Sequence, residues 1–210
     1  MNLKSLKLED VVENAKSIAA SSKRSILAIA GAPGSGKTTI TQSIVKELGP
    51  ENVVIVPMDG FHLSNTILKK WDRRSRKGAW DTFDASGYIN LISRIKNQRE
   101  EIILAPDFDR DIDESIGGVI EVSINTPLIL LEGTFLFSEH GLWPELLPLI
   151  DHGWFVHLES SIRQQRLIQR HMKHGMDLKQ ATQWALSTDE ANAKAVELDY
   201  KRASLYFQLT

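Results

Sequence analysis

The stretch "SILAIAGAPGSGKTTIT" (residues 25–41) constrains the fold of this chain more than any other. An apolar run over residues 26–30 predicts a buried strand, and three glycines follow within six positions, before Lys37 and two threonines. Glycines let a backbone turn so that its N–H groups point inward around an anion. A helix that begins at the lysine would add its positively polarised N-terminus. A strand, a glycine-rich turn and a helix in this order indicate a phosphate-binding loop.

Residues 31–38 fit the pattern G-x-x-x-x-G-K-[ST], in which the lysine reaches the β- and γ-phosphates and the hydroxyl binds Mg²⁺. We therefore expect nucleotide contacts from Gly31, Ala32, Pro33, Gly34, Ser35, Gly36, Lys37, Thr38 and Thr39. Thr38 is also expected to be a metal ligand. The motif predicts a nucleoside triphosphate with Mg²⁺, but it does not say what happens to the γ-phosphate.

Apolar strands alternate with helical patterns along the chain. Strands are predicted over residues 26–30, 52–58, 127–133 and 154–159, two more in a hairpin over 101–108 and 118–124, and a last one in the tail. Helices are predicted in the first 20 residues and over residues 40–48, 87–98, 142–150, 161–174 and 178–192. This alternation predicts a mainly parallel sheet between two helical layers, a three-layer α/β/α sandwich with a helical lid. We expect one domain over residues 1–210, with an acceptor-binding insertion at about 60–125 and the lid at about 161–176.

Composition narrows the classes of partner. The net charge of −2 provides no basic field for nucleic acid, and the absence of cysteine excludes disulfides and thiolate metal sites. No apolar run approaches the length of about 18 residues that a membrane-spanning helix needs. We expect a cytoplasmic protein with a small-molecule acceptor and no nucleic-acid or membrane partner, and a homodimer stays open as its assembly.

Two carboxylates follow predicted strands, where ligands of a parallel sheet bind. The chain has neither the N-K-x-D motif of GTPases nor a motor or transporter signature, which leaves a small-molecule kinase. Asp59 directly follows the strand 52–58 and is the candidate acceptor base, unless it only caps the next helix. Glu132 ends the strand 127–133 and is expected to hold Mg²⁺ through water, or to orient Lys37 and the acceptor.

Three arginines share one face of the predicted helix 161–174. Arg163, Arg166 and Arg170 are spaced three and four residues apart. Arg166 and Arg170 are expected to cover the phosphates and stabilise the charge that develops in transfer. Alternatively, the three arginines form only a solvent-exposed basic face of the helix, an interpretation that applies most to Arg163. Ser161 is expected to cap the helix and Gly175 to end it.

Seven segments occur in the same order as in a known family. They are "GAPGSGKTT", "VPMDGFHLSN", "RSRKGAWDTFD", "PDFDR", "LILLEGTFL", "RLIQRHMKHG" and "DEAN". Over residues 25 to about 196 the chain resembles the phosphoribulokinase/uridine kinase family of P-loop kinases. Its likeness is greatest to the small bacterial branch described as pantothenate-kinase-like or as sugar kinases.

The resemblance implies an ATP- and Mg²⁺-dependent kinase acting on a hydroxyl of a sugar, pantothenate or a related acid. It makes Asp59 the acceptor-activating aspartate, Arg166 and Arg170 lid arginines, and Asn192 a residue near the nucleotide base. It assigns the acceptor pocket to Asp59, Phe61, His62, Arg76, Lys77, Phe83, Asp84, Asp109 and Arg110. A uridine or nucleoside kinase stays an alternative, as does a non-catalytic nucleotide-binding regulator.

The chain departs from the family pattern in two places. Trp80-Asp81 stands where the branch usually has Pro-Glu, which leaves the acceptor open. The segment "PDFDRDIDES" lacks the histidine that uridine kinases carry after their Tyr-Asp-Phe, which argues against a uridine pocket. Basic residues at 73, 74, 76 and 77 suggest an anionic acceptor, with a basic surface loop as the alternative.

Overall fold

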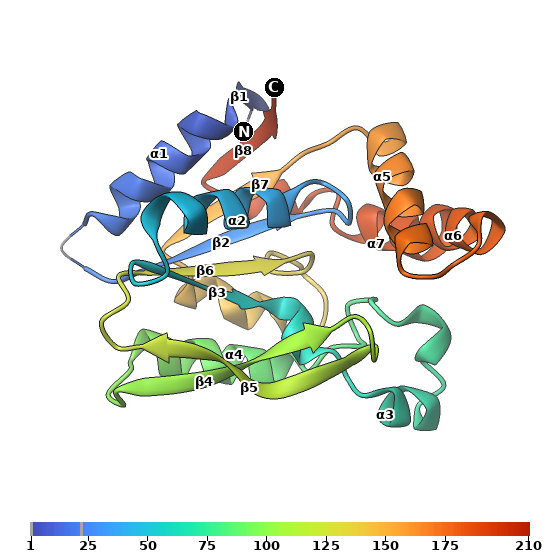
Figure 1. The fold of residues 1–210 in the computed structure, drawn as a ribbon, viewed down its shortest axis with the longest axis horizontal. Coiled ribbons are helices and arrows are strands. Elements are labelled where there is room, and N and C mark those ends of the chain that lie inside the picture. Colours follow the sequence, from blue (N-terminus) through green and yellow to red (C-terminus); the bar gives the residue numbers. More distant parts are fainter. Residues whose placement is uncertain (1, 22) are drawn as a thin grey trace.

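A six-stranded parallel sheet forms the centre of the molecule (Figure 1). The computed structural model describes residues 2–21 and 23–210. The strand order is β1-β8-β7-β2-β6-β3, and every neighbouring pair is parallel. The strands are β1 (Lys4–Leu6), β2 (Ser25–Gly31), β3 (Val53–Pro57), β6 (Leu128–Gly133), β7 (His152–Val156) and β8 (Leu205–Leu209). Strand β2 is buried along its whole length, as its continuous apolar run predicts.

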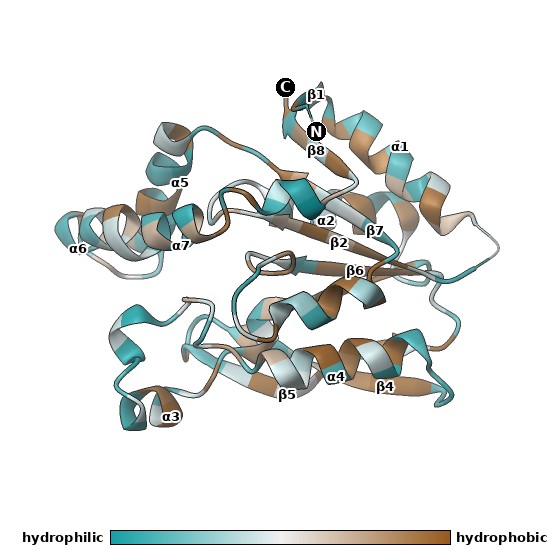
Figure 2. Ribbon diagram, turned by 180° about the vertical axis from the view of Figure 1, so that it is seen from behind, coloured by the Kyte–Doolittle hydropathy of each residue, from teal (hydrophilic) through white to brown (hydrophobic). Residues whose placement is uncertain are grey.

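Helices cover both faces of this sheet, because the side chains of β2 alternate between two hydrophobic cores. Leu27 and Ile29 pack with α1 (Leu8–Ala19) and α2 (Lys37–Leu48) on one face. Ile26 and Ala28 pack on the other face with α4 (Ala85–Lys96) and the 3₁₀-helical segment Trp143–Leu149. Figure 2 shows the apolar strands enclosed between these layers. The predicted three-layer α/β sandwich is confirmed.

The predicted insertion contains a separate antiparallel hairpin. It consists of β4 (Ile102–Asp109) and β5 (Glu114–Ser123), and α3 (Asn65–Lys70) precedes it in the chain. The insertion is not detached from the rest, since Tyr88 and Ile92 of α4 are fully buried in the main core. A Cβ on Gly60 would lie 2.4 Å from the carbonyl oxygen of Pro106. The hairpin therefore packs directly against the backbone that follows Asp59.

The predicted lid at about 161–176 lies at the start of a helical segment with three helices and a π-helical turn. They are α5 (Ser160–Lys173), α6 (Leu178–Trp184), the π-helical turn Ala185–Asp189 and α7 (Glu190–Ala195). The expected continuous helix over 178–192 is wrong, because the π turn interrupts it. In Figure 1 the lid and the α3 segment lie at the same end of the molecule, toward which β6 points.

Three further expectations need correction. The first 20 residues are not one helix, because Lys4–Leu6 pairs with β8 as strand β1; residue 1 lies outside the described part. Helix α5 begins at Ser160 after Glu159, so Ser161 lies inside the helix and is not its cap. The segment 142–150 is 3₁₀-helical around Pro148, and β7 already ends at Val156. Within the described ranges, no helix combines the length and the apolar character needed to span a bilayer.

Candidate functional site

The phosphate loop joins β2 to α2, and α2 begins at Lys37 as the motif predicts. Gly36 precedes it with φ +100°, a left-handed conformation that glycine adopts without strain. The Lys37 ammonium donates to the carbonyls of Gly31 (2.9 Å) and Ala32 (3.1 Å). Burial lowers the pKa of Lys37 to about 8, although the charges of Glu132 and Asp59 raise it. The loop thus holds a buried cation directly beside its own backbone.

Glu132 lies beside the start of α2. Strand β6 lies between β2 and β3 and pairs with both. Its Glu132 is opposite Ile29 of β2 and Pro57 of β3, near the carboxyl ends of these strands. The Thr38 hydroxyl donates to Oε1 of Glu132, and the Thr41 hydroxyl lies 2.9 Å from Oε2. Thr41 is completely buried. A hydroxyl and a carboxylate held together in this way supply the hard oxygen ligands that Mg²⁺ takes.

Asp59 lies two residues beyond β3, in the 3₁₀ turn Met58–Phe61. Its Oδ2 accepts a hydrogen bond from Arg110 Nη2 at 3.1 Å, and its carbonyl lies 2.8 Å from His62 Nδ1. Burial raises the pKa of the Asp59 carboxyl, but the charge of His62 in its protonated form and the charges of Arg110, Lys37 and Arg170 outweigh it, so the pKa lies below its usual value. Asp59 is therefore a carboxylate at neutral pH, which is the form that can accept a proton.

His62 belongs to an aromatic wall next to Asp59. Its ring centroid lies 4.1 Å from that of Phe83 and 4.5 Å from that of Phe108. Burial lowers the pKa of His62, against the effect of Asp59, so the ring is neutral at pH 7. This wall offers an apolar surface beside a carboxylate.

The lid arginines fall into two groups. Arg163 is buried, and its guanidinium contacts Glu190 (3.2 Å) and the Pro33 carbonyl (3.4 Å), so it anchors α5 to the phosphate loop and to α7. Arg166 and Arg170 are exposed to the cleft instead. Arg166 Nη1 would lie 3.7 Å from a Cβ built on Gly36, at the start of α2. The structure therefore separates Arg163 from the other two.

These parts line one cleft of about 1220 Å³. Of the predicted site residues, the cleft brings together Pro33, Gly34, Ser35, Gly36, Lys37, Thr38, Thr39, Asp59, His62, Lys77, Phe83, Arg110, Glu132, Arg166, Arg170 and Asn192. The buried Asn192 donates to the Gly78 carbonyl at 3.0 Å and so links α7 to the acceptor side.

Six predicted site residues do not line the cleft: Gly31, Ala32, Phe61, Arg76, Asp84 and Asp109. The two loop residues offer Lys37 their carbonyls.

The other four have structural contacts. Phe61 packs edge-to-face on Tyr88, and Arg76 forms an ion pair with Asp81. Asp84 caps α4 by accepting from the Gly87 amide, and Asp109 accepts from two backbone amides in the hairpin turn.

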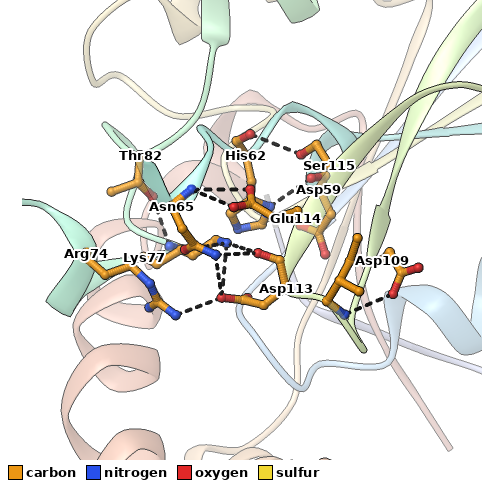
Figure 3. Close-up of polar contacts among 12 residues, drawn as sticks. Asp59, His62, Asn65, Arg74, Lys77, Thr82, Asp109, Asp113, Glu114 and Ser115 are labelled. Atoms are coloured by element: carbon orange, nitrogen blue, oxygen red, sulfur yellow. Dashed lines mark hydrogen bonds and ion pairs between the residues drawn. The ribbon is translucent and has the colours of Figure 1, made fainter. Parts of the chain in front are cut away.

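Several residues in or beside the site were not predicted, among them Asp107, Phe108 and Asp111, which line the cleft. Thr41 lies one turn after Thr38 on α2, so its helical spacing could have indicated it. Asn65 and Asp113 connect the α3 segment to the hairpin turn, as Figure 3 shows. They lie 48 residues apart in the sequence, and no local sequence pattern predicts a contact over that separation.

A parallel sheet with this loop at its carboxyl edge defines the class of P-loop nucleotide-binding proteins. The sequence profile of the phosphoribulokinase/uridine kinase family matches residues 26–210, and the chain belongs to this family of kinases.

The chain is also similar to individual proteins and to a solved structure. The chain is 32% identical over 162 residues to a Schizosaccharomyces pombe protein named "Putative uridine kinase C227.14", covering 73% of this chain and 69% of that one. It is 29% identical over 192 residues to the Escherichia coli "Uncharacterized protein YggC", with 90% and 79% covered. A crystal structure described as a "putative fructose transport system kinase" from Silicibacter sp. TM1040 superimposes with a TM-score of 0.82 at 30% identity. That superposition covers 97% of this chain and 98% of the other.

Proposed function

We propose that the protein transfers the γ-phosphoryl group of ATP, with Mg²⁺, to a hydroxyl of a small metabolite such as a sugar, pantothenate or a related acid. The observation that carries the proposal is the position of Asp59. It lines the same cleft as the phosphate loop, and its negative charge raises the pKa of Lys37 in that loop. A hydroxyl placed between them would meet both a base and the phosphoryl group.

Each residue then has a role in transfer. The acceptor oxygen forms a bond to the γ-phosphorus while the bond to the β–γ bridging oxygen breaks, ADP leaves, and the acceptor proton passes to Asp59. Lys37 contacts the β- and γ-phosphates, and Arg166 and Arg170 neutralise charge on the transferring group.

Thr38 and Glu132 would hold Mg²⁺, directly or through water. The ion would neutralise charge on the phosphates.

Two alternatives are separated by one experiment. The first alternative is a nucleoside kinase, which the name of the Schizosaccharomyces pombe relative favours. The second is a regulator that binds the nucleotide but transfers no phosphoryl group. ADP release is measured with ATP and Mg²⁺ over a panel of sugars, pantothenate, glycerate and nucleosides. The proposal predicts release above background with a sugar or an acid. Release with nucleosides alone supports the first alternative, and ATP binding without release supports the second.

A further inference from the structure

The acceptor half of the cleft contains more carboxylates than cations. This half is the wall formed by residues 55–83 and 107–120. Its charged side chains are Asp59, Arg74, Lys77, Asp107, Arg110, Asp111 and Asp113. Four carboxylates thus face three cations, an arrangement that would repel an anion.

Each of the three cations already has a carboxylate partner. Arg74 pairs with Asp113 Oδ2 at 2.8 Å, Lys77 lies 3.2 Å from the same oxygen, and Arg110 pairs with Asp59 at 3.1 Å. In the described part of the chain, Asp107 and Asp111 have no cation within 4 Å. The charge of each of these cations is therefore already balanced by a protein carboxylate before an acceptor binds, which weakens its attraction for a further anion.

Lys77 in particular is a structural residue. It is buried, and its ammonium also donates to Asn65 Oδ1 (3.1 Å) and to the Asp113 carbonyl (Figure 3). The ammonium also lies 5.0 Å from the centroid of the Phe108 ring. Asp113 has φ +55° at the hairpin turn, so its backbone and side chain both face the α3 segment. Two hydrogen bonds, an ion pair and an aromatic ring thus hold the ammonium in place.

The remaining basic residues of the segment are also occupied. Arg73 and Arg76 both pair with Asp81, and neither lines the cleft. The sequence-based suggestion that residues 73–77 bind an anionic acceptor therefore finds no free cation among them.

We infer that the acceptor is an uncharged polyhydroxy compound rather than a carboxylate or a phosphate ester. This inference rests on the proposed function. Hydroxyl groups donate to Asp59, Asp107 and Asp111, while the wall of His62 and Phe108 packs against the C–H face of the acceptor.

The test compares each acid with its own methyl ester, which keeps every hydroxyl. Glycerate, gluconate and pantothenate are each measured against their esters, beside ribose, xylose and fructose, by ADP release. We expect the kcat/KM of each ester that is a substrate to exceed that of its acid at least tenfold. If none of the three acids or their esters is a substrate, we expect turnover of the neutral sugars alone. An acid used as well as its ester overturns the inference and leaves the proposed function intact. No release with any compound, while ATP still binds, overturns both.

A pair of variants tests the role of Asp113. Asp113→Asn removes the charge that neutralises Arg74 and Lys77, and asparagine tolerates the left-handed backbone. Glu121→Gln, on the exposed face of β5 and outside the cleft, changes the net charge equally without freeing a paired cation. We expect Asp113→Asn to raise the acid-to-ester ratio of kcat/KM at least fivefold, and Glu121→Gln to change it less than twofold. Equal shifts in both variants, or none in either, contradict the neutralising role of Asp113.

Discussion

Thr41 lies behind Glu132, away from any position that a ligand on the phosphate loop would take. Its hydroxyl is completely buried, 2.9 Å from Oε2, while Thr38 donates to Oε1. The two hydroxyls fix both oxygens of the carboxylate. We regard Thr41 as a positioning residue, because it would act on the metal only through Glu132.

Thr41→Val should therefore weaken the use of Mg²⁺. Valine fills the same volume but leaves Oε2 without its partner, and outer-shell losses of this kind typically cost about 10–100-fold in affinity or activity. We expect a higher Mg²⁺ requirement and a lower kcat in steady-state kinetics. Thr41→Ser keeps the hydroxyl and should recover most of both. Equal behaviour of the two variants would show that the hydroxyl has no such role.

Lys37 gives nucleotide binding a specific dependence on pH. Its pKa of about 8 in the free protein means that it loses its proton above pH 8, whereas bound phosphates favour the protonated form. ATP should therefore bind about tenfold more weakly at pH 9 than well below pH 8, with uptake of a proton. Calorimetry in buffers of different ionisation enthalpy measures both effects.

Two observations separate this effect from unfolding. The lowered pKa of Lys37 makes the unfolded chain the stronger proton binder, so this residue's contribution to stability rises with pH between about 8 and 10.5. Affinity and stability should therefore change in opposite directions. The arginine in Lys37→Arg keeps its charge at pH 9. If ATP affinity in this variant falls between pH 8 and pH 9 as much as in the wild type, deprotonation of Lys37 is not the cause.

At the scale of elements, α5 is anchored to the phosphate loop near its start and to the π-helical turn near its end. Arg163 and Leu167 contact the loop near Pro33 and Gly34, whereas Arg166 and Arg170 line the cleft. Near the end of the helix, His171 Nε2 lies 2.7 Å from Oδ2 of the buried Asp189. Gly175 follows the helix with φ +93° and has no neighbour within 4 Å of a built Cβ. A movement of this end of α5 would therefore carry the π-helical turn with it.

Nucleotide should order the second half of α5. Hydrogen exchange measured with and without a non-hydrolysable ATP analogue should show new protection over residues 166–174, because the arginines there would gain phosphate contacts. Helix α4 lies in the core and serves as the control. Unchanged exchange in α5 would mean that the helix is a static support.

The elements around the loop could be predicted because their signals are local. The glycine spacing, the strand before it and the acids after β3 and β6 all lie within short segments, and each lies where the sequence places it. Strand β1 could not be predicted, because its three residues are ordered by pairing with β8 at the other end of the chain. The pair of Arg74 with Asp113 likewise depends on packing that no short pattern encodes. The capping role of Asp84 is local, by contrast, and an Asp directly before a helix could have indicated it.

At the scale of the molecule, the cleft has two walls with different roles. The phosphate loop and lid supply cations for a nucleotide, and the hairpin and α3 segment supply carboxylates and aromatic rings. Asn192 connects the walls through Gly78, where a role at the nucleotide base was expected. The homodimer, the cytoplasmic location and the absence of nucleic-acid and membrane partners stay predictions. Light scattering of the purified protein tests the first of them.

The most direct test of the account is Asp59→Asn, in which ATP binding and turnover are measured on the same protein. Asparagine keeps the size of the side chain but cannot accept the acceptor proton, and loss of a general base typically costs about 10²–10⁴ in rate. We predict near-normal ATP affinity, since the phosphate loop is intact, and turnover reduced by that factor with the best acceptor. Wild-type turnover, or loss of ATP binding with turnover of bound substrate intact, would contradict the assignment and point to Glu132, which lines the same cleft, as the base.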